Sequence, residues 1–168
     1  MILTLALITY ATAIILANLL VATFGPGVTP INAFVLIGLD LALRDWLHLR
    51  LSPWRMALLI LATGGVSYLL NPTAGVIAVA SAVSFVIAAL ADWLVFAKLQ
   101  GSWQRRANIS NVCGAGVDSL LFPTLAFGVL MPEIVLAQFV AKTIGGALWT
   151  WGLGNVIQVL ANNEKHGD

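Results

Sequence analysis

Long apolar stretches, separated by short breaks of glycine, proline or polar residues, run along nearly the whole chain. A helix needs about 20 mainly apolar residues to cross the hydrocarbon core of a bilayer, and these stretches are of about that length. The breaks at Gly25-Pro26-Gly27, Asn71-Pro72 and Pro132-Glu133 are sequences that end a helix. The pattern predicts membrane-spanning helices over about residues 2–24, 30–43, 56–70, 73–99, 108–131 and 134–160.

The first two predicted spans differ in character. Residues Ile2 to Phe24 lack the basic start and short apolar core of a secretory signal and are long enough to cross a bilayer, so we expect this span to be retained. The second span is short, and the amphipathic stretch from Arg44 to Leu51 is expected to extend it.

The composition agrees with an all-α integral membrane protein of six helices and short loops. Hydrophobic residues make up 60% of the chain and charged residues only 9%, against roughly 25% charged residues in soluble domains. With 168 residues, six spans leave almost no room for a separate soluble domain, so residues 1–168 are expected to form one domain. A net charge of +1 gives no basic surface for nucleic acid, and the single cysteine, Cys113, excludes a thiolate metal cluster.

Basic residues predict the orientation. They concentrate around the loops after the second and fourth spans and in the tail, whereas the other interhelical loops carry none. By the positive-inside rule, these loops and both termini are expected on the cytoplasmic side of a multi-pass protein of the cytoplasmic (inner) membrane. The residues concerned are Arg44, Arg50, Arg55, Lys98, Arg105, Arg106 and Lys165.

Asp118 and Lys142 are the ionisable residues that lie deepest inside predicted spans. A charge at the bilayer centre costs roughly 2.5–3.5 kcal/mol on insertion scales, so such groups face a bundle interior or an aqueous cavity and find a partner there. At about 1.5 Å per residue, both lie near the middle of a core about 30 Å thick. We therefore expect them to be partners, either as part of a functional site or as an ion pair that fixes helix register.

Further polar residues accompany this pair. Asn111 lies two helical turns before Asp118 on the same predicted face, and Gln138 lies one turn before Lys142. Nearer the predicted cytoplasmic ends, Asp40 lies four residues before Arg44, where the two can pair within one helix. Ser119 and Thr143 add hydrogen-bond donors and acceptors. Asp92 and Asp118 are candidates for gating or ion coupling. For Asp40, Arg44 and Asp92, which lie near the predicted cytoplasmic ends, an interfacial salt bridge is the alternative role.

The chain offers little for catalysis. His48 and His166 lie in a loop and in the tail, without the spacing of metal ligands. No Ser-His-Asp set, HExxH sequence or phosphate-binding loop is present in the sequence. We expect a protein that is not an enzyme and needs neither metal nor cofactor.

Several segments resemble the queuosine-precursor transporter (vitamin uptake transporter) family. These are residues 32–44 with their D-x3-R sequence, residues 91–96, residues 110–127 and Lys142. The strongest element is the pattern SN-x6-DS-x2-F-x3-AF of residues 110–127. The resemblance implies a six-helix importer of deazaguanine bases such as 7-cyano-7-deazaguanine and 7-aminomethyl-7-deazaguanine, which bacteria use to make queuosine in tRNA.

This substrate class suits the polar residues chemically. A deazaguanine donates hydrogen bonds from N1–H and its exocyclic amine and accepts at its carbonyl, so carboxylates, amide or cationic donors and aromatic faces would bind it. Phe34 is a further aromatic candidate beside the expected set. The expected substrate-binding residues are Asp118, Asn111, Lys142, Gln138, Asp40, Arg44, Asn32, Phe122, Phe127 and Trp149.

Two alternatives remain open at this point. The six-helix plan is also similar to the substrate-binding subunits of energy-coupling-factor transporters, which are ATP-driven importers of vitamins or nucleobases. Such subunits dock ATPase modules through a motif of small residues. Ala13 and Ala17 match that motif weakly. A structural membrane protein would use the buried charges for packing alone. The chain shows no ATPase motif of its own, so uptake would be facilitated diffusion or coupled to an ion, and the sequence leaves a homo-oligomer open.

Overall fold

The computed structural model describes residues 2–48, 50–101 and 103–165, and it describes those at 41, 44–46, 48, 53, 93, 103–108, 150 and 153–165 as backbone only. Its described residues form helices joined by short connections and no strand, which confirms the predicted all-α class. The helices are α1 (Ile2–Phe24), η1 (Pro26–Val28), α2 (Thr29–Asn32), η2 (Ala33–Ile37), α3 (Gly38–His48), α4 (Pro53–Leu70), α5 (Pro72–Lys98), α6 (Trp103–Phe127) and α7 (Pro132–Lys165).

Helix ends follow the glycine and proline signals in the sequence. Gly25 and Gly128 adopt φ values of 72° and 71°, a left-handed conformation that favours glycine and stops α1 and α6. The end of α6 therefore precedes the predicted end of the fifth span at residue 131. Between α4 and α5, the side chain of Asn71 accepts a hydrogen bond from the backbone N–H of Thr73 at 3.0 Å and caps α5.

The second predicted span is one continuous helical segment with an irregular middle. α2, η2 and α3 follow one another from residue 29 to residue 48, so the helix continues into the amphipathic stretch as expected. Its central part, η2, is a π-helix of five residues. Such wide turns are rare and occur often at functional sites, and the apolar pattern alone gave no sign of this one.

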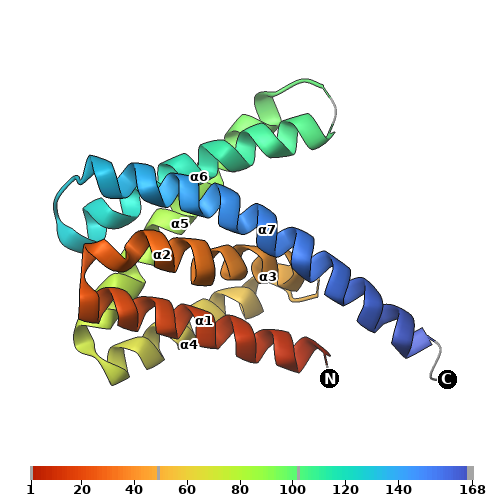
Figure 1. The fold of residues 1–168 in the computed structure, drawn as a ribbon, viewed down its shortest axis with the longest axis horizontal. Helices are drawn as coiled ribbons and strands as arrows, with labels where there is room; N and C mark the ends of the chain where they lie inside the picture. The colour runs from red at the N-terminus through yellow and green to blue at the C-terminus, as the bar shows by residue number, and fades with distance from the viewer. Residues whose placement is uncertain (1, 49, 102, 166–168) are drawn as a thin grey trace.

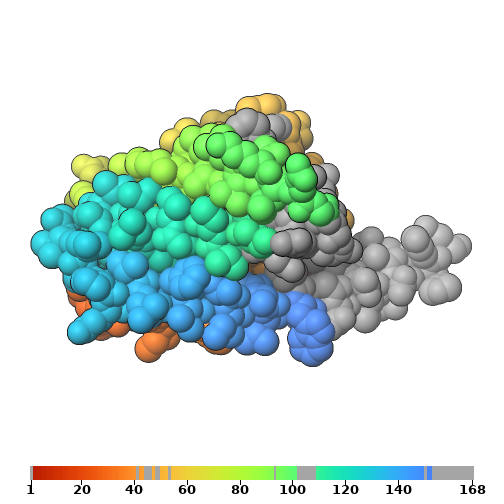
Figure 2. Space-filling view, turned by 90° about the horizontal axis from the view of Figure 1, so that it is seen from above, coloured from red at the N-terminus to blue at the C-terminus, as the bar shows by residue number. Residues whose placement is uncertain are grey.

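The helices form one bundle in which the connections gather at two ends (Figure 1). The α1–α2, α4–α5 and α6–α7 connections lie at one end, and the two termini lie at the other, together with the α3–α4 and α5–α6 connections (Figure 1). Figure 2 shows α6 between α5 and α7 on one face of the molecule. α5 and α6 form a hairpin that extends away from the other helices toward its connection (Figure 1).

The surface of the bundle is apolar and its interior is unusually polar. Leu61, Leu69 and Leu136 expose 65–83% of their surface, whereas Asp40 and Lys142 are buried. This distribution suits helices that face lipid, because a protein in water would bury such large apolar side chains. By length and composition, α1 and α5 are long and apolar enough to cross a membrane, and residues Trp54–Leu70 form a shorter apolar helix.

Small residues allow helices to approach closely near the centre of the bundle. A Cβ at Gly145 of α7 would lie 2.5 Å from the backbone oxygen of Phe34 in η2, so only glycine permits this crossing. Ala13 and Ala17 of α1 are also buried, each 3% exposed, and thus pack against helices of the same chain. The weak docking motif of the sequence is therefore covered in this structure.

Candidate functional site

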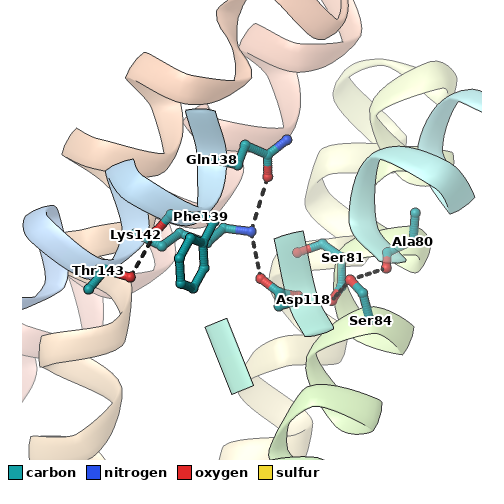
Figure 3. A network of polar contacts seen from close by, with 8 residues as sticks. All are labelled: Ala80, Ser81, Ser84, Asp118, Gln138, Phe139, Lys142 and Thr143. Carbon is teal, nitrogen blue, oxygen red and sulfur yellow. Dashed lines mark hydrogen bonds and ion pairs between the residues drawn. The ribbon is translucent and has the colours of Figure 1, made fainter. Parts of the chain in front are cut away.

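A buried polar network joins α6 to α7. Lys142 Nζ donates hydrogen bonds to Asp118 Oδ2 at 2.7 Å and to Gln138 Oε1 at 3.0 Å (Figure 3). Gln138 and Lys142 lie one turn apart on α7, and both side chains point toward α6 (Figure 3). The partnership of Asp118 with Lys142 that the apolar pattern predicted is thus present.

The network is largely shielded from water. The side chain of Lys142 is 4% exposed and that of Asp118 is 21% exposed, and Gln138 is 1% exposed. The ring of Phe122 lies 5.7 Å from Lys142 Nζ, one turn beyond Asp118 on α6, at a distance that permits a cation–π contact. Buried charges need this degree of compensation, because neither group retains its full hydration.

A small cavity of about 30 Å³ lies beside the network. This is room for roughly two water molecules and is too small for a two-ring base, so the structure shows a closed arrangement of the helices. The lining residues come from α1, α2, η2, α5, α6 and α7. They are Ala17, Asn18, Val21, Thr29, Asn32, Ala33, Ile37, Ile77, Ser81, Asp118, Phe122, Gln138 and Lys142.

A second cavity of about 50 Å³ lies next to the first and contains the other buried carboxylate. Asp40, 1% exposed, lines it together with Tyr10 and Thr63. The two cavities share four lining residues, Ala17, Asn18, Ile37 and Ser81. These shared residues lie between two cavities that contain one carboxylate each, Asp118 in the first and Asp40 in the second.

Two asparagines from the first half of the chain hold α1 at this site. Asn18 Nδ2 donates to Ser67 Oγ of α4 at 3.2 Å, and Asn32 Nδ2 donates to the backbone oxygen of Ala17 at 3.0 Å. Sequence reasoning included Asn32 but missed Asn18. The sequence does indicate a role for Asn18, because it is the one amide side chain in the apolar run of residues 2–24.

A family model described as "Putative vitamin uptake transporter" matches residues 4–155 of the chain. The chain belongs to this family of vitamin uptake transporters. The match covers every residue of the network and both cavities, so the transporter's buried polar site lies within the part of the chain that defines the family. No curated protein and no solved structure matches the chain.

The transporter brings some of the expected site residues together and separates others. Asp118, Lys142, Gln138, Asn32 and Phe122 line the first cavity, and Asp40 lines the second. Arg44 lies outside the residues whose side chains the structure describes.

Asn111, Phe127 and Trp149 line neither of these cavities. Asn111 is exposed, so the face of α6 that it shares with Asp118 is uncovered at its level. The ring of Trp149 packs at the crossing of α7 with Gly38 instead.

The remaining candidates of the sequence lie apart from the network. Asp92 of α5 packs against Gly114 of α6, because a Cβ added at Gly114 would lie 3.2 Å from the Cβ of Asp92. Among the described residues, no group of three or more histidine, cysteine or acidic side chains is placed to hold a metal ion. Membership of a transporter family favours binding and release of a small molecule over catalysis as the task of the buried network.

Proposed function

We propose that this protein imports a queuosine precursor, 7-cyano-7-deazaguanine or 7-aminomethyl-7-deazaguanine, across the cytoplasmic membrane. The observation that carries the proposal is the Asp118–Lys142–Gln138 network beside a cavity in the interior of a bundle whose surface is apolar. Buried ionisable groups in membrane proteins mark substrate pathways more often than packing contacts. The family match supplies the transport class, and the resemblance of residues 110–127 supplies the substrate class.

In the proposed topology, six helical segments cross the membrane and both termini are cytoplasmic. The two termini share an end of the bundle with the α3–α4 and α5–α6 connections (Figure 1). Arg55 and Lys98, next to these connections, are exposed, and the three connections at the other end contain neither lysine nor arginine. This charge difference supports a cytoplasmic position for the end that carries the termini.

In the proposed site, the polar groups complement a flat, neutral base. Asp118 accepts a hydrogen bond from the exocyclic amine, and the ring of Phe122 packs against the base. Lys142 carries three N–H donors and uses two of them within the described part of the chain, for Asp118 and Gln138. The third is available for a substrate acceptor.

Transport requires the bundle to open, because the cavities of about 30 and 50 Å³ are smaller than a base. We propose that the base enters from outside and occupies the space that forms between Asp118 and Asp40 when the two cavities join. It leaves when the helices rearrange toward the cytoplasm. Asp92 and Asp118 are the candidate groups for coupling to an ion, and facilitated diffusion is the alternative.

The test is the queuosine content of tRNA in a bacterium that cannot make deazaguanines and is fed a limiting amount of 7-cyano-7-deazaguanine. Cells that carry this gene should restore the modification, and cells with Asp118→Asn should lose it when the two are compared at equal amounts of protein in the membranes. Glu133→Gln is the matched control, because it neutralises an exposed carboxylate at the start of α7 and should leave restoration intact. No restoration by the parent protein, verified in the membrane, would refute the proposed substrate.

A further inference from the structure

Two of the three amide side chains that line the first cavity, Gln138 and Asn32, have orientations that their partners determine. Gln138 lies beside Lys142, whose ammonium group only donates, so Oε1 must face Lys142 and Nε2 must point elsewhere. Asn32 lies beside the backbone oxygen of Ala17, which only accepts, so Nδ2 must face it and Oδ1 must point elsewhere. The assignment of oxygen and nitrogen in both amides therefore follows from chemistry.

In both amides, the polar atom that points away from the partner just named is buried and has no partner among the described residues. Within the described part of the chain, Asn32 Oδ1 and Gln138 Nε2 make no hydrogen bond, and the two residues are 6% and 1% exposed. Both residues line the same cavity. A buried polar atom that has lost its hydration and gained no partner is costly, and such atoms are rare in folded proteins unless something binds them.

The two atoms are one acceptor and one donor. Together they complement an edge on which an N–H donor stands beside an acceptor, as in a cyclic amide, or lactam. The acceptor opposite Gln138 Nε2 also lies in the field of the Lys142 ammonium, whose third N–H is available. A carbonyl oxygen has two lone pairs and can accept from both donors, whereas a ring nitrogen has one.

We propose that Asn32 Oδ1 and Gln138 Nε2 recognise the lactam edge of a planar heterocycle, with Asn32 accepting from the ring N–H and Gln138 donating to the carbonyl. The ligand is neutral, because Asp118 and Lys142 already neutralise each other. This deepens the proposed function and rests on its site, since a 7-deazaguanine carries such an edge at N1–H and its carbonyl. Gln138 thus determines specificity between 6-oxo and 6-amino bases.

The experiment measures binding by isothermal titration calorimetry to the full chain in lipid nanodiscs. One ligand is 7-cyano-7-deazaguanine and the other is its 6-amino counterpart, which reverses donor and acceptor on this edge but keeps the exocyclic 2-amine and the nitrile. The parent protein should bind the 6-oxo base at least tenfold more tightly. Equal affinity for the two bases would overturn the inference.

The variant Gln138→Glu makes the test specific to this residue. Glutamate can still accept from Lys142 but cannot donate at the former Nε2 position, so the ratio of the two affinities should fall at least tenfold toward one. Gln138→Met, which also lacks the donor, should lower the ratio likewise if Gln138→Glu proves unstable. Gln100→Glu, at an exposed position outside the bundle core, should leave the ratio unchanged. A ratio that survives both Gln138 variants would overturn the inference.

A second ligand pair separates this inference from the proposed substrate. Pterin carries a lactam edge on a different bicyclic ring, and 2,4-diaminopteridine is its amino counterpart. A Gln138-dependent preference for pterin, with no binding of 7-cyano-7-deazaguanine, would support lactam recognition and refute the proposed substrate. Binding of both deazapurines with equal affinity would do the reverse, and binding of none of the four ligands would overturn the inference.

Discussion

The ion pair between Asp118 and Lys142 is the most consequential contact at the scale of single residues. Both charges have left water for a bundle interior, where removal of one partner leaves the other uncompensated. A pair retained only for structure would be replaceable by two neutral side chains, since desolvation offsets much of its attraction. A pair that binds substrate would not be replaceable in this way.

Single and double substitutions distinguish these roles. Asp118→Asn should lower the free energy of unfolding by about 3 kcal/mol, because Lys142 would remain buried without a counter-charge. The double variant Asp118→Asn/Lys142→Gln should regain most of that stability, as measured by thermal unfolding in detergent, but should stay inactive in uptake. Full uptake by the double variant would show that the pair serves only to hold the helices.

The sequence predicted this pair because two opposite charges within apolar runs have few other partners at their depth. It also pointed to Gln138, one turn from Lys142. Asn111 shows the limit of such reasoning: helical spacing determines which face a residue shares, but a neighbouring helix determines whether that face is covered. Asn18 could have been found by the same argument that found Asp118, because an amide in an apolar span also needs a partner.

At the scale of helices, the crossing of η2 with α7 supports the site. Gly145 of α7 lies against the backbone of Phe34, one turn beyond Lys142 along α7, and Asn32 directly precedes η2. The two sides of the proposed ligand site are therefore connected to one close backbone contact. A change in that contact should therefore alter ligand binding at the site.

A side chain at this crossing should be costly. Gly145→Ala would place a Cβ 2.5 Å from the Phe34 oxygen, so η2 and α7 must move apart, and we expect a loss of about 1–3 kcal/mol of stability together with weaker ligand binding. Gly152→Ala in the same helix meets nothing within 4 Å and should be neutral or stabilising. Equal midpoints of thermal unfolding for the two variants would contradict this packing.

Helix ends were predictable where glycine, proline or asparagine determines the backbone, as at Gly25 and Asn71. The π-helix of η2 was not, because a wider turn leaves the apolar pattern of residues 33–37 unchanged and depends on how neighbouring helices pack. The continuation of the second span through α3 to His48 was predictable, because the stretch after residue 43 is amphipathic.

At the scale of the whole molecule, an apolar exterior and a polar interior match a transporter that carries its substrate through the middle of a bundle. The burial of Ala13 and Ala17 also bears on partners, because a docking stripe for an ATPase module would need to face outward. We therefore propose that the molecule transports without a partner ATPase.

The proposed orientation can be tested by cysteine labelling. In a Cys113→Ser background, Gln100→Cys in the α5–α6 connection should react with a membrane-impermeant maleimide only after the cells are opened, and Gly27→Cys should react in intact cells. Both positions are exposed, and they lie at opposite ends of the bundle (Figure 1). Reaction of both cysteines from the same side would contradict the six-span topology.

Uptake by the purified protein alone is the most direct test of the proposed import. Proteoliposomes loaded with unlabelled 7-cyano-7-deazaguanine should take up the labelled base by exchange, without ATP or another protein, and liposomes with Asp118→Asn should not. Glu133→Gln liposomes should exchange as the parent does. No exchange by parent protein that is folded and inserted in the liposomes would contradict import of this base by the Asp118–Lys142 site.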